Sequence, residues 1–402
     1  MCAAAATEAV AQGNGQDGGA LVLNNQLQLG DVISGQTLNV EGATDQVTVS
    51  NAATGSSLSG ATEGVSLDVR NVQTMNGNAR ATTEISTTGD TAAVISATTQ
   101  ATGNALAGAA YGGDFAIDSD QRVGPSEITA STAVRGGTAR LLNGADVTAA
   151  ATGNSAALAG NVGVISGAVH QVSDASVRAE NLAETQYIPA AAVFGAQAIG
   201  NAAAVNGLDQ SGQSIYIGQR STGDVVTANT SANAGNAWDL TGASVATANQ
   251  AVIANQGGSV VARTQQENFS QVASTAVTTA YDYGRAVATA EGSGNAVSVG
   301  NNDKYLELDN SQLNSGGVEV QASFAGAQGY DAYVSANAVG NSVTGYACAE
   351  CEATLNATNT QTNDGNVSAS ANTTITGANR NVITGSSAVG NAATFYVSRP
   401  GQ

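Results

Sequence analysis

Short stretches in which apolar and polar residues alternate recur along the whole chain. Residues 47–49, 318–322 and 366–371 place valine or alanine at every second position, which is the period of a β-strand with one buried face. Turn-forming residues, such as those at 88–90 and 222–224, interrupt the stretches at short intervals. Because Gly, Asn and Asp accept backbone conformations that close turns, the pattern predicts an all-β protein made of many short strands.

One motif, Ala-x-Gly-Asn followed by small and aliphatic residues, returns at a near-constant spacing. Clear copies lie at 101–108, 198–207 and 338–345. The position of the asparagine is occupied by Ser56, Asn104, Asn154, Asn201, Asn249, Asn295, Asn341 and Asn391. A near-constant interval across the whole chain is the signature of a repeat architecture. We therefore interpret the chain as about eight tandem units of roughly 48 residues.

The Gly-Asn pair is interpreted as a corner of the backbone in each unit. Glycine adopts positive φ without steric cost, and asparagine tolerates the left-handed region. We expect asparagine side chains stacked at these corners to form hydrogen bonds along the repeat axis. Further Gly-Asn pairs at 77–78 and 365–366 lie near the middle of their units. This half-period suggests two rungs in each repeat, each of them half a unit long.

Two architectures fit this period. An eight-bladed propeller needs four strands per blade, and its blades pack through large side chains. The chain has a single tryptophan, Trp238, and only 4% aromatic residues. A parallel β-solenoid instead accepts Ala, Val, Ser and Thr in its interior. We therefore predict one repetitive β-solenoid domain at 31–402, preceded by a flexible segment at 12–30.

The first residues indicate export. Residues 9–11, Ala-Val-Ala, have the small-x-small pattern of a signal-peptidase site, and 1–11 is interpreted as the remnant of a signal peptide that starts upstream. Two alternatives remain, a lipoprotein with Cys2 as its lipidated residue and an unstructured Ala-rich start. No run reaches the roughly 20 apolar residues of a membrane helix, so no transmembrane segment is predicted.

Charge excludes one class of partner. The chain has 31 acidic and 12 basic residues, with a net charge of −19. Nucleic acids are bound through clusters of positive charge, so no nucleic-acid partner is expected.

Candidate catalytic and metal-binding residues are scattered. His170 is the only histidine, so no pair of histidines can form a catalytic or metal site. The densest acidic segment is interpreted as a polar loop, because it lacks the spacing of a known calcium loop; it contains Asp114, Asp118 and Asp120. We therefore expect no enzyme activity, no cofactor and no metal.

The pair Cys348 and Cys351 forms a C-x-x-C sequence. A zinc site would need a second such pair, and a thioredoxin-like site would need a helix that is not predicted here. In an exported protein, the two thiols are expected to form a local disulfide that stabilises a loop.

The last strand is unusually apolar and is a candidate edge for assembly. Solenoid ends expose unpaired strand edges, which proteins either cap or use for association. The strand comprises Ala393, Thr394, Phe395, Tyr396 and Val397. We expect these residues to mediate self-association.

The acidic character and the Gly-Asn-Ala repeats, as at 198–207 and 388–395, resemble the holdfast anchor protein family HfaD. This resemblance implies an exported, outer-membrane-associated protein at the cell surface. It further implies that the protein multimerises, contacts other envelope anchor proteins and tethers an adhesive polysaccharide. The alternative is a carbohydrate-active or tail-spike-like solenoid. The repeats are also similar to curlin units, but these are shorter and keep Gln at fixed offsets, which is not expected here.

Overall fold

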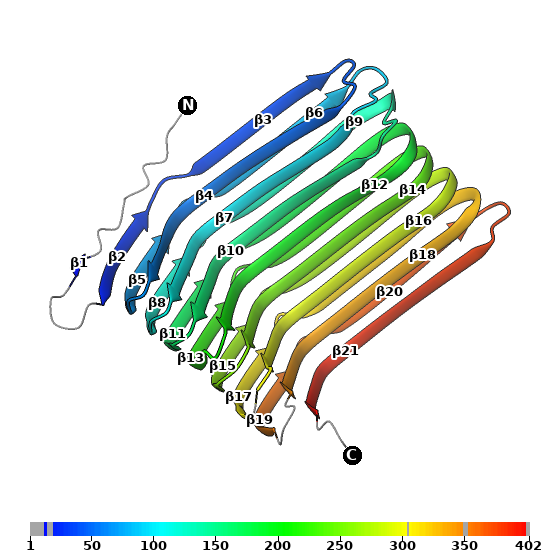
Figure 1. Ribbon diagram of the computed structural model, residues 1–402. Helices are drawn as coiled ribbons and strands as arrows, with labels where there is room; N and C mark the ends of the chain where they lie inside the picture. The colour runs from blue at the N-terminus through cyan, green and yellow to red at the C-terminus, as the bar shows by residue number, and fades with distance from the viewer. Residues whose placement is uncertain (1–11, 14–18, 304, 349–352, 399–402) are drawn as a thin grey trace.

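The chain folds into a stack of coils built only from strands. The computed structural model describes residues 12–13, 19–303, 305–348 and 353–398, and these residues form 21 β-strands without a helix. Figure 1 shows the coils side by side along one axis, with β3 (Val32–Val40) and β21 (Asn381–Ser398) at opposite ends of the stack. Neighbouring coils pair in parallel, so the predicted parallel β-solenoid is confirmed and the propeller is excluded.

Each coil has a first run, a second run and a longer third run that returns to the start of the next coil. The first runs are β2 (Ala20–Gln28), β5 (Leu67–Met75), β8 (Phe115–Val123), β11 (Val164–Ser173), β13 (Gly212–Ser221), β15 (Ser259–Asn268), β17 (Tyr305–Asn314) and β19 (Thr354–Asn363). They form one sheet in that order. The separate second runs are β3 (Val32–Val40), β6 (Ala79–Thr87), β9 (Glu127–Arg140) and β20 (Val367–Ile375).

The third runs lie opposite the first and second runs and close each coil. Those that are separate strands are β4 (Gln46–Glu63), β7 (Val94–Tyr111), β10 (Ala145–Asn161) and β21 (Asn381–Ser398). In coils four to seven the second and third runs are continuous, as β12 (Ser176–Leu208), β14 (Val225–Asn255), β16 (Gln271–Asn301) and β18 (Val318–Cys348). The described residues thus make eight coils.

Alternation of side chains decides which face of each strand is buried. In β8, Phe115, Ile117 and Gln121 point inward and are buried, whereas Asp118 and Asp120 are exposed. Two apolar cores result, because the first run packs on one half of the third run and the second run packs on its other half. Phe115 packs with Leu158 between first and third runs, and Ile85 packs with Ile95 between second and third runs.

The half-period found in the sequence does not correspond to a separate rung. Stacked partners are one whole repeat apart, as Asn201 and Asn249 are, so each sequence repeat makes one coil. The half-period reflects the internal division of that coil, since Gly77 lies at the junction of first and second runs. Eight coils spaced by about 4.8 Å give a stack roughly 34 Å long between its first and last strands.

Regular structure begins before residue 31. Within the expected flexible segment 12–30, β2 pairs in parallel with β5 over its whole length. The short strand β1 (Gln12–Gly13) then pairs antiparallel with the start of β2. Residues 20–28 are therefore part of the solenoid, and the inward-facing Ala20 and Val22 join the core between the first and third runs. The proposed signal-peptide remnant, 1–11, lies outside the described residues.

Candidate assembly surface

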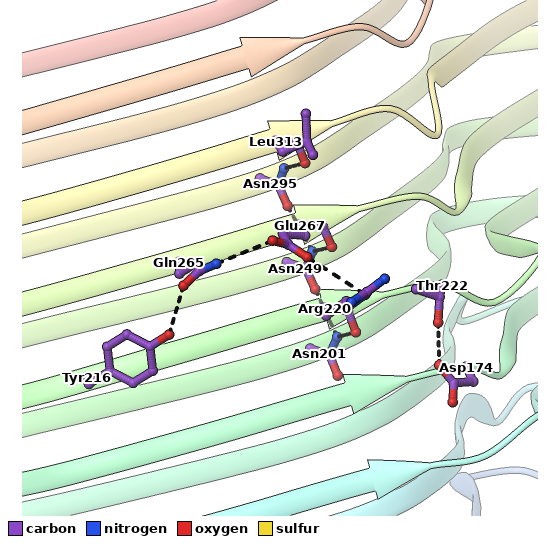
Figure 2. A network of polar contacts seen from close by, with 10 residues as sticks. All are labelled: Asp174, Asn201, Tyr216, Arg220, Thr222, Asn249, Gln265, Glu267, Asn295 and Leu313. Atoms are coloured by element: carbon purple, nitrogen blue, oxygen red, sulfur yellow. Dashed lines mark hydrogen bonds and ion pairs between the residues drawn. The ribbon is translucent and has the colours of Figure 1, made fainter.

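A row of asparagine side chains runs through the interior of the stack. It lies where the third run bends, and its members from Asn104 to Asn341 are fully buried. Each amide nitrogen donates to the Oδ1 of the next asparagine at 2.7–2.9 Å. The same nitrogen donates to a backbone carbonyl of the opposite layer, as Asn201 does to Arg220 at 2.9 Å (Figure 2). The repeated asparagines therefore connect neighbouring coils and both layers.

The row is incomplete at its N-terminal end. Ser56 is the residue aligned with Asn104 in the preceding coil. The Oδ1 atom of Asn104 is buried and has no hydrogen-bond partner among the described residues. A shorter serine side chain thus leaves one buried acceptor unsatisfied, which costs stability.

A second row, of glutamines, spans all eight coils and was not expected from the sequence. Its members are Gln26, Gln73, Gln121, Gln171, Gln219, Gln266, Gln312 and Gln361. From Gln73 onward, the side-chain amide of each glutamine donates to the Oε1 of the glutamine in the preceding coil at 2.7–2.9 Å. The expectation that glutamine keeps no fixed offset is therefore wrong. A search for every residue type that recurs at the repeat spacing would have found the glutamine row.

The two rows hold the layers in one register. Asparagine amides donate toward the C-terminal neighbour, whereas glutamine amides donate toward the N-terminal neighbour. Each buried amide that loses its partner costs about 1–3 kcal/mol. If one coil slipped by one residue against its neighbour, these bonds between the two coils would break. The rows therefore fix the alignment of the coils and also stabilise the stack.

The repeated glycine has a different role from the one expected. None of the glycines before the aligned asparagines is among the described residues with positive φ. A Cβ atom on Gly103 would lie 2.5 Å from the carbonyl oxygen of Gly153, and one on Gly153 would lie 2.4 Å from that of Gly200. Glycine is therefore present because the bends of successive coils stack closely, not because the chain turns through the left-handed region.

The C-terminal coil leaves its core side open. Among the described residues, no strand pairs with the outer edges of β19, β20 and β21. Phe395 lies over Gly345 of the preceding coil and is 39% exposed, and Val382 is 49% exposed. Their aligned neighbours in the preceding coil, Gly345 and Ala332, are buried. The eighth coil thus presents core side chains that a ninth coil would cover.

The five residues of the candidate assembly edge lie in β21 and divide between its two faces. By their alignment with buried residues of β18, Ala393, Phe395 and Val397 face the core side. Tyr396 faces outward, where its ring stacks on that of Tyr346 with centroids 5.7 Å apart. Only the inward-facing subset therefore contributes to the open apolar surface.

The outer face of the first runs carries polar pairs between neighbouring coils. The Tyr216 hydroxyl donates to Gln265 at 3.1 Å, and the Arg220 guanidinium lies 3.8 Å from the Glu267 carboxylate (Figure 2). Exposed pairs of this kind contribute little stability individually.

Three of the remaining candidate residues lie together on the outer face of the first runs, where His170 is aligned with Asp120 and both line one shallow hollow with Asp118. Asp118 and Asp120 belong to β8, so the interpretation of their segment as a polar loop is wrong for these two residues. His170 lies on the outer face of β11, and the centroid of its ring is 5.1 Å from that of the Tyr216 ring. Asp114 accepts a backbone hydrogen bond from Val164 at 2.9 Å. In the described part of the chain, no three His, Cys, Asp or Glu residues form a group that could hold a metal.

Cys348 is half-buried at the end of β18. Cys351 lies outside the described residues, so the disulfide between them stays a prediction.

These features define a class of protein, a parallel β-solenoid scaffold aligned by internal amide rows. The family model for holdfast attachment protein D, HfaD, matches residues 41–317, and the chain belongs to this family. The resemblance found in the sequence is thereby confirmed, and the family role is attachment, which is structural. No curated protein and no solved structure gives a match. Across the described residues, no helix is long and apolar enough to cross a membrane.

Proposed function

We propose that this protein is an exported scaffold that anchors the holdfast polysaccharide to the outer envelope, where it self-associates through its C-terminal coil. The observation that carries self-association is the open core of the eighth coil. Phe395 and Val382 are more than a third exposed although their faces are buried in the preceding coils. Covering such side chains contributes roughly 25 cal/mol per Å² of apolar area.

The unpaired strand edges of the C-terminal coil also favour association at this surface. The free edges of β19, β20 and β21 offer backbone donors and acceptors in the register that the stack already uses. A second copy, or another envelope anchor protein with a β-edge, would continue the sheets and cover the core. A contact between the C-terminal coil of one copy and the N-terminal coil of the next joins unlike surfaces, and because the stacking continues along one axis, repeated addition would give an open chain of molecules.

The test compares two neighbouring residues of β21. Val382→Asp places a charge on the core side of the open coil, whereas Ile383→Asp places one on the outer face, where Ile383 is 58% exposed. We expect light scattering to show multimers for the unmodified protein and for Ile383→Asp, and smaller species for Val382→Asp and for a deletion of 393–397. Circular dichroism would verify folding of each variant. An unchanged size distribution in both Val382→Asp and the deletion would contradict the proposal.

A further inference from the structure

Exposed aromatic side chains gather where the second run passes into the third run of coils four to seven. We call this region the turn edge; it comprises residues 187–188, 236–238, 282–284 and 328–330. Trp238 is 60% exposed and Tyr330 is 52% exposed, and Tyr187 and the adjoining Tyr281 are also exposed. The chain has only 4% aromatic residues, so four exposed rings along one edge are a marked concentration. Exposed apolar groupings of this kind mark binding surfaces.

The rings of the turn edge are held in place by the coil between them. Trp238 and Tyr330 come from coils five and seven, yet their centroids are 6.2 Å apart with the ring planes at 75°. Gly284 occupies the aligned position in coil six, and a Cβ atom there would lie 2.4 Å from the Trp238 carbonyl oxygen. Beneath them, the buried Tyr283 ring packs edge-on against Phe324 at 4.8 Å. The absence of a side chain at Gly284 thus lets two large rings meet above a packed base.

Polar groups surround the rings. A shallow hollow of about 590 Å³ is lined by aromatic and polar side chains, namely Tyr187, Trp238, Tyr283, Tyr330, Asn236, Asp282 and Gln328. Asp282 Oδ1 is shielded from solvent and has no hydrogen-bond partner among the described residues. Buried polar atoms in native proteins are usually paired, so the Asp282 carboxylate, which lines the hollow, is not fully satisfied by the described residues.

The positive charges at the turn edge are compensated within the protein. The Arg285 guanidinium lies 3.6 Å from the Asp239 carboxylate. Arg380 is paired with Asp331 and lies over the Tyr330 ring, 5.5 Å from its centroid. Neither of these arginines is therefore left to attract a polyanion, and the net charge of −19 repels one.

We propose that the turn edge binds a polysaccharide through its uncharged pyranose rings. The apolar C–H face of a sugar ring stacks on Trp238 and Tyr330, while its hydroxyls hydrogen-bond to the amides and the carboxylate of the hollow. A stable protein–protein contact needs about 1,200 Å² or more of buried surface, which favours a glycan over a protein at so small a patch. This inference rests on the proposed tethering of a polysaccharide and names the surface that performs it.

The experiment uses Trp238 itself as the probe, because it is the only tryptophan in the chain. Its fluorescence is titrated with three neutral glycans, hydroxyethylcellulose, galactomannan and glycol chitin, and with alginate as a polyanion. We expect at least one neutral glycan to shift or quench the emission. Tyr330→Ala should weaken that response at least tenfold. Tyr111→Ala, which removes another exposed tyrosine from the far end of the third run, should leave it unchanged.

Three outcomes would overturn the proposal: no response to any neutral glycan, a response to alginate alone, or equal responses of Tyr330→Ala and the unmodified protein. Retardation in native gels that contain each glycan separates this inference from the proposed function. If a glycan retards the protein and its Trp238→Ala variant equally, another surface tethers the polysaccharide and only the turn-edge site is wrong. If no glycan retards the protein while light scattering still shows multimers, tethering fails and self-association stands.

Discussion

The side chain of Gln266 donates a hydrogen bond of 2.7 Å to Gln219, a residue 47 positions earlier in the chain. Gln266 is fully buried and also donates to the Ala296 carbonyl of the opposite layer at 3.1 Å. It accepts a third bond from Gln312 at 2.9 Å. One amide therefore joins three successive coils and both layers.

Replacing this glutamine should destabilise the stack strongly. Gln266→Leu keeps the approximate volume but leaves the Oε1 of Gln219 and the amide of Gln312 each short of one partner. At about 1–3 kcal/mol for each unsatisfied buried group, we expect a loss of about 3 kcal/mol. The measurement is the urea midpoint by circular dichroism.

The neighbouring residue supplies the control. Gln265 has the same side chain on the exposed face of β15, so Gln265→Leu should change the free energy of unfolding by about 0.5 kcal/mol or less. Equal midpoints for Gln265→Leu and Gln266→Leu would mean that the internal row does not stabilise the fold.

The asparagine row can be extended by one residue. In Ser56→Asn, the new amide can donate to the unsatisfied Oδ1 of Asn104 and to the carbonyl of Thr74, which is aligned with the Arg122 carbonyl used by Asn104. We expect a gain of about 1 kcal/mol, measured as a higher urea midpoint. Ser57→Asn, on the exposed side of the same strand, should have no such effect. A midpoint that falls in Ser56→Asn would show that the site has no room for the longer side chain.

The repeat length and the solenoid could be predicted because the Ala-x-Gly-Asn motif keeps one local context in most units. The glutamine row could not be recognised in that way, since Gln121 and Gln171 stand among unlike neighbours. Only pairing between coils gives them a shared role. The function of Gly103 was misjudged for a related reason: a close approach to Gly153 of the next coil leaves no trace in local turn propensity.

The apolar strand at 393–397 indicated the open end of the stack, whereas no sequence motif indicated the turn edge. Its aromatic residues, such as Trp238 and Tyr330, are far apart in sequence and occupy aligned positions in only two of the coils. A motif search favours positions that repeat in every unit. A binding surface built from departures from the repeat becomes visible only when the coils are aligned in space.

Acid should loosen the last coil. Asp331 accepts hydrogen bonds from Arg380 and, at 2.8 Å, from Asn381, and these bonds lower its pKa below the ordinary aspartate value. Because the folded state binds the proton less readily than the unfolded state, the stabilisation is present above the ordinary pKa of about 3.9. It is lost as the pH falls through the lower, folded-state value.

The variant Asp331→Asn tests this dependence. We expect it to have a lower urea midpoint than the unmodified protein at pH 7, and the difference should shrink as the pH falls below that of ordinary aspartate titration. Asp309→Asn, a change on the exposed face of β17, should show no comparable difference at pH 7. A difference for Asp331→Asn that stays constant into strong acid would refute the role of this carboxylate.

A glycine inside β11 should be the most sensitive of those that stack closely. Gly167 has φ of +125°, and a Cβ atom there would lie 1.8 Å from the Ile117 carbonyl oxygen of the preceding coil. Gly167→Ala therefore combines backbone strain with a clash against fixed backbone, and we expect a loss of about 2–3 kcal/mol. In contrast, a Cβ atom on Gly35 would meet nothing within 4 Å. Gly35→Ala should raise stability by about 0.4–1 kcal/mol, because alanine reduces the entropy of the unfolded chain. Urea midpoints of the two variants measure both effects, and a Gly167→Ala protein as stable as Gly35→Ala would show that the coils can separate locally at little cost.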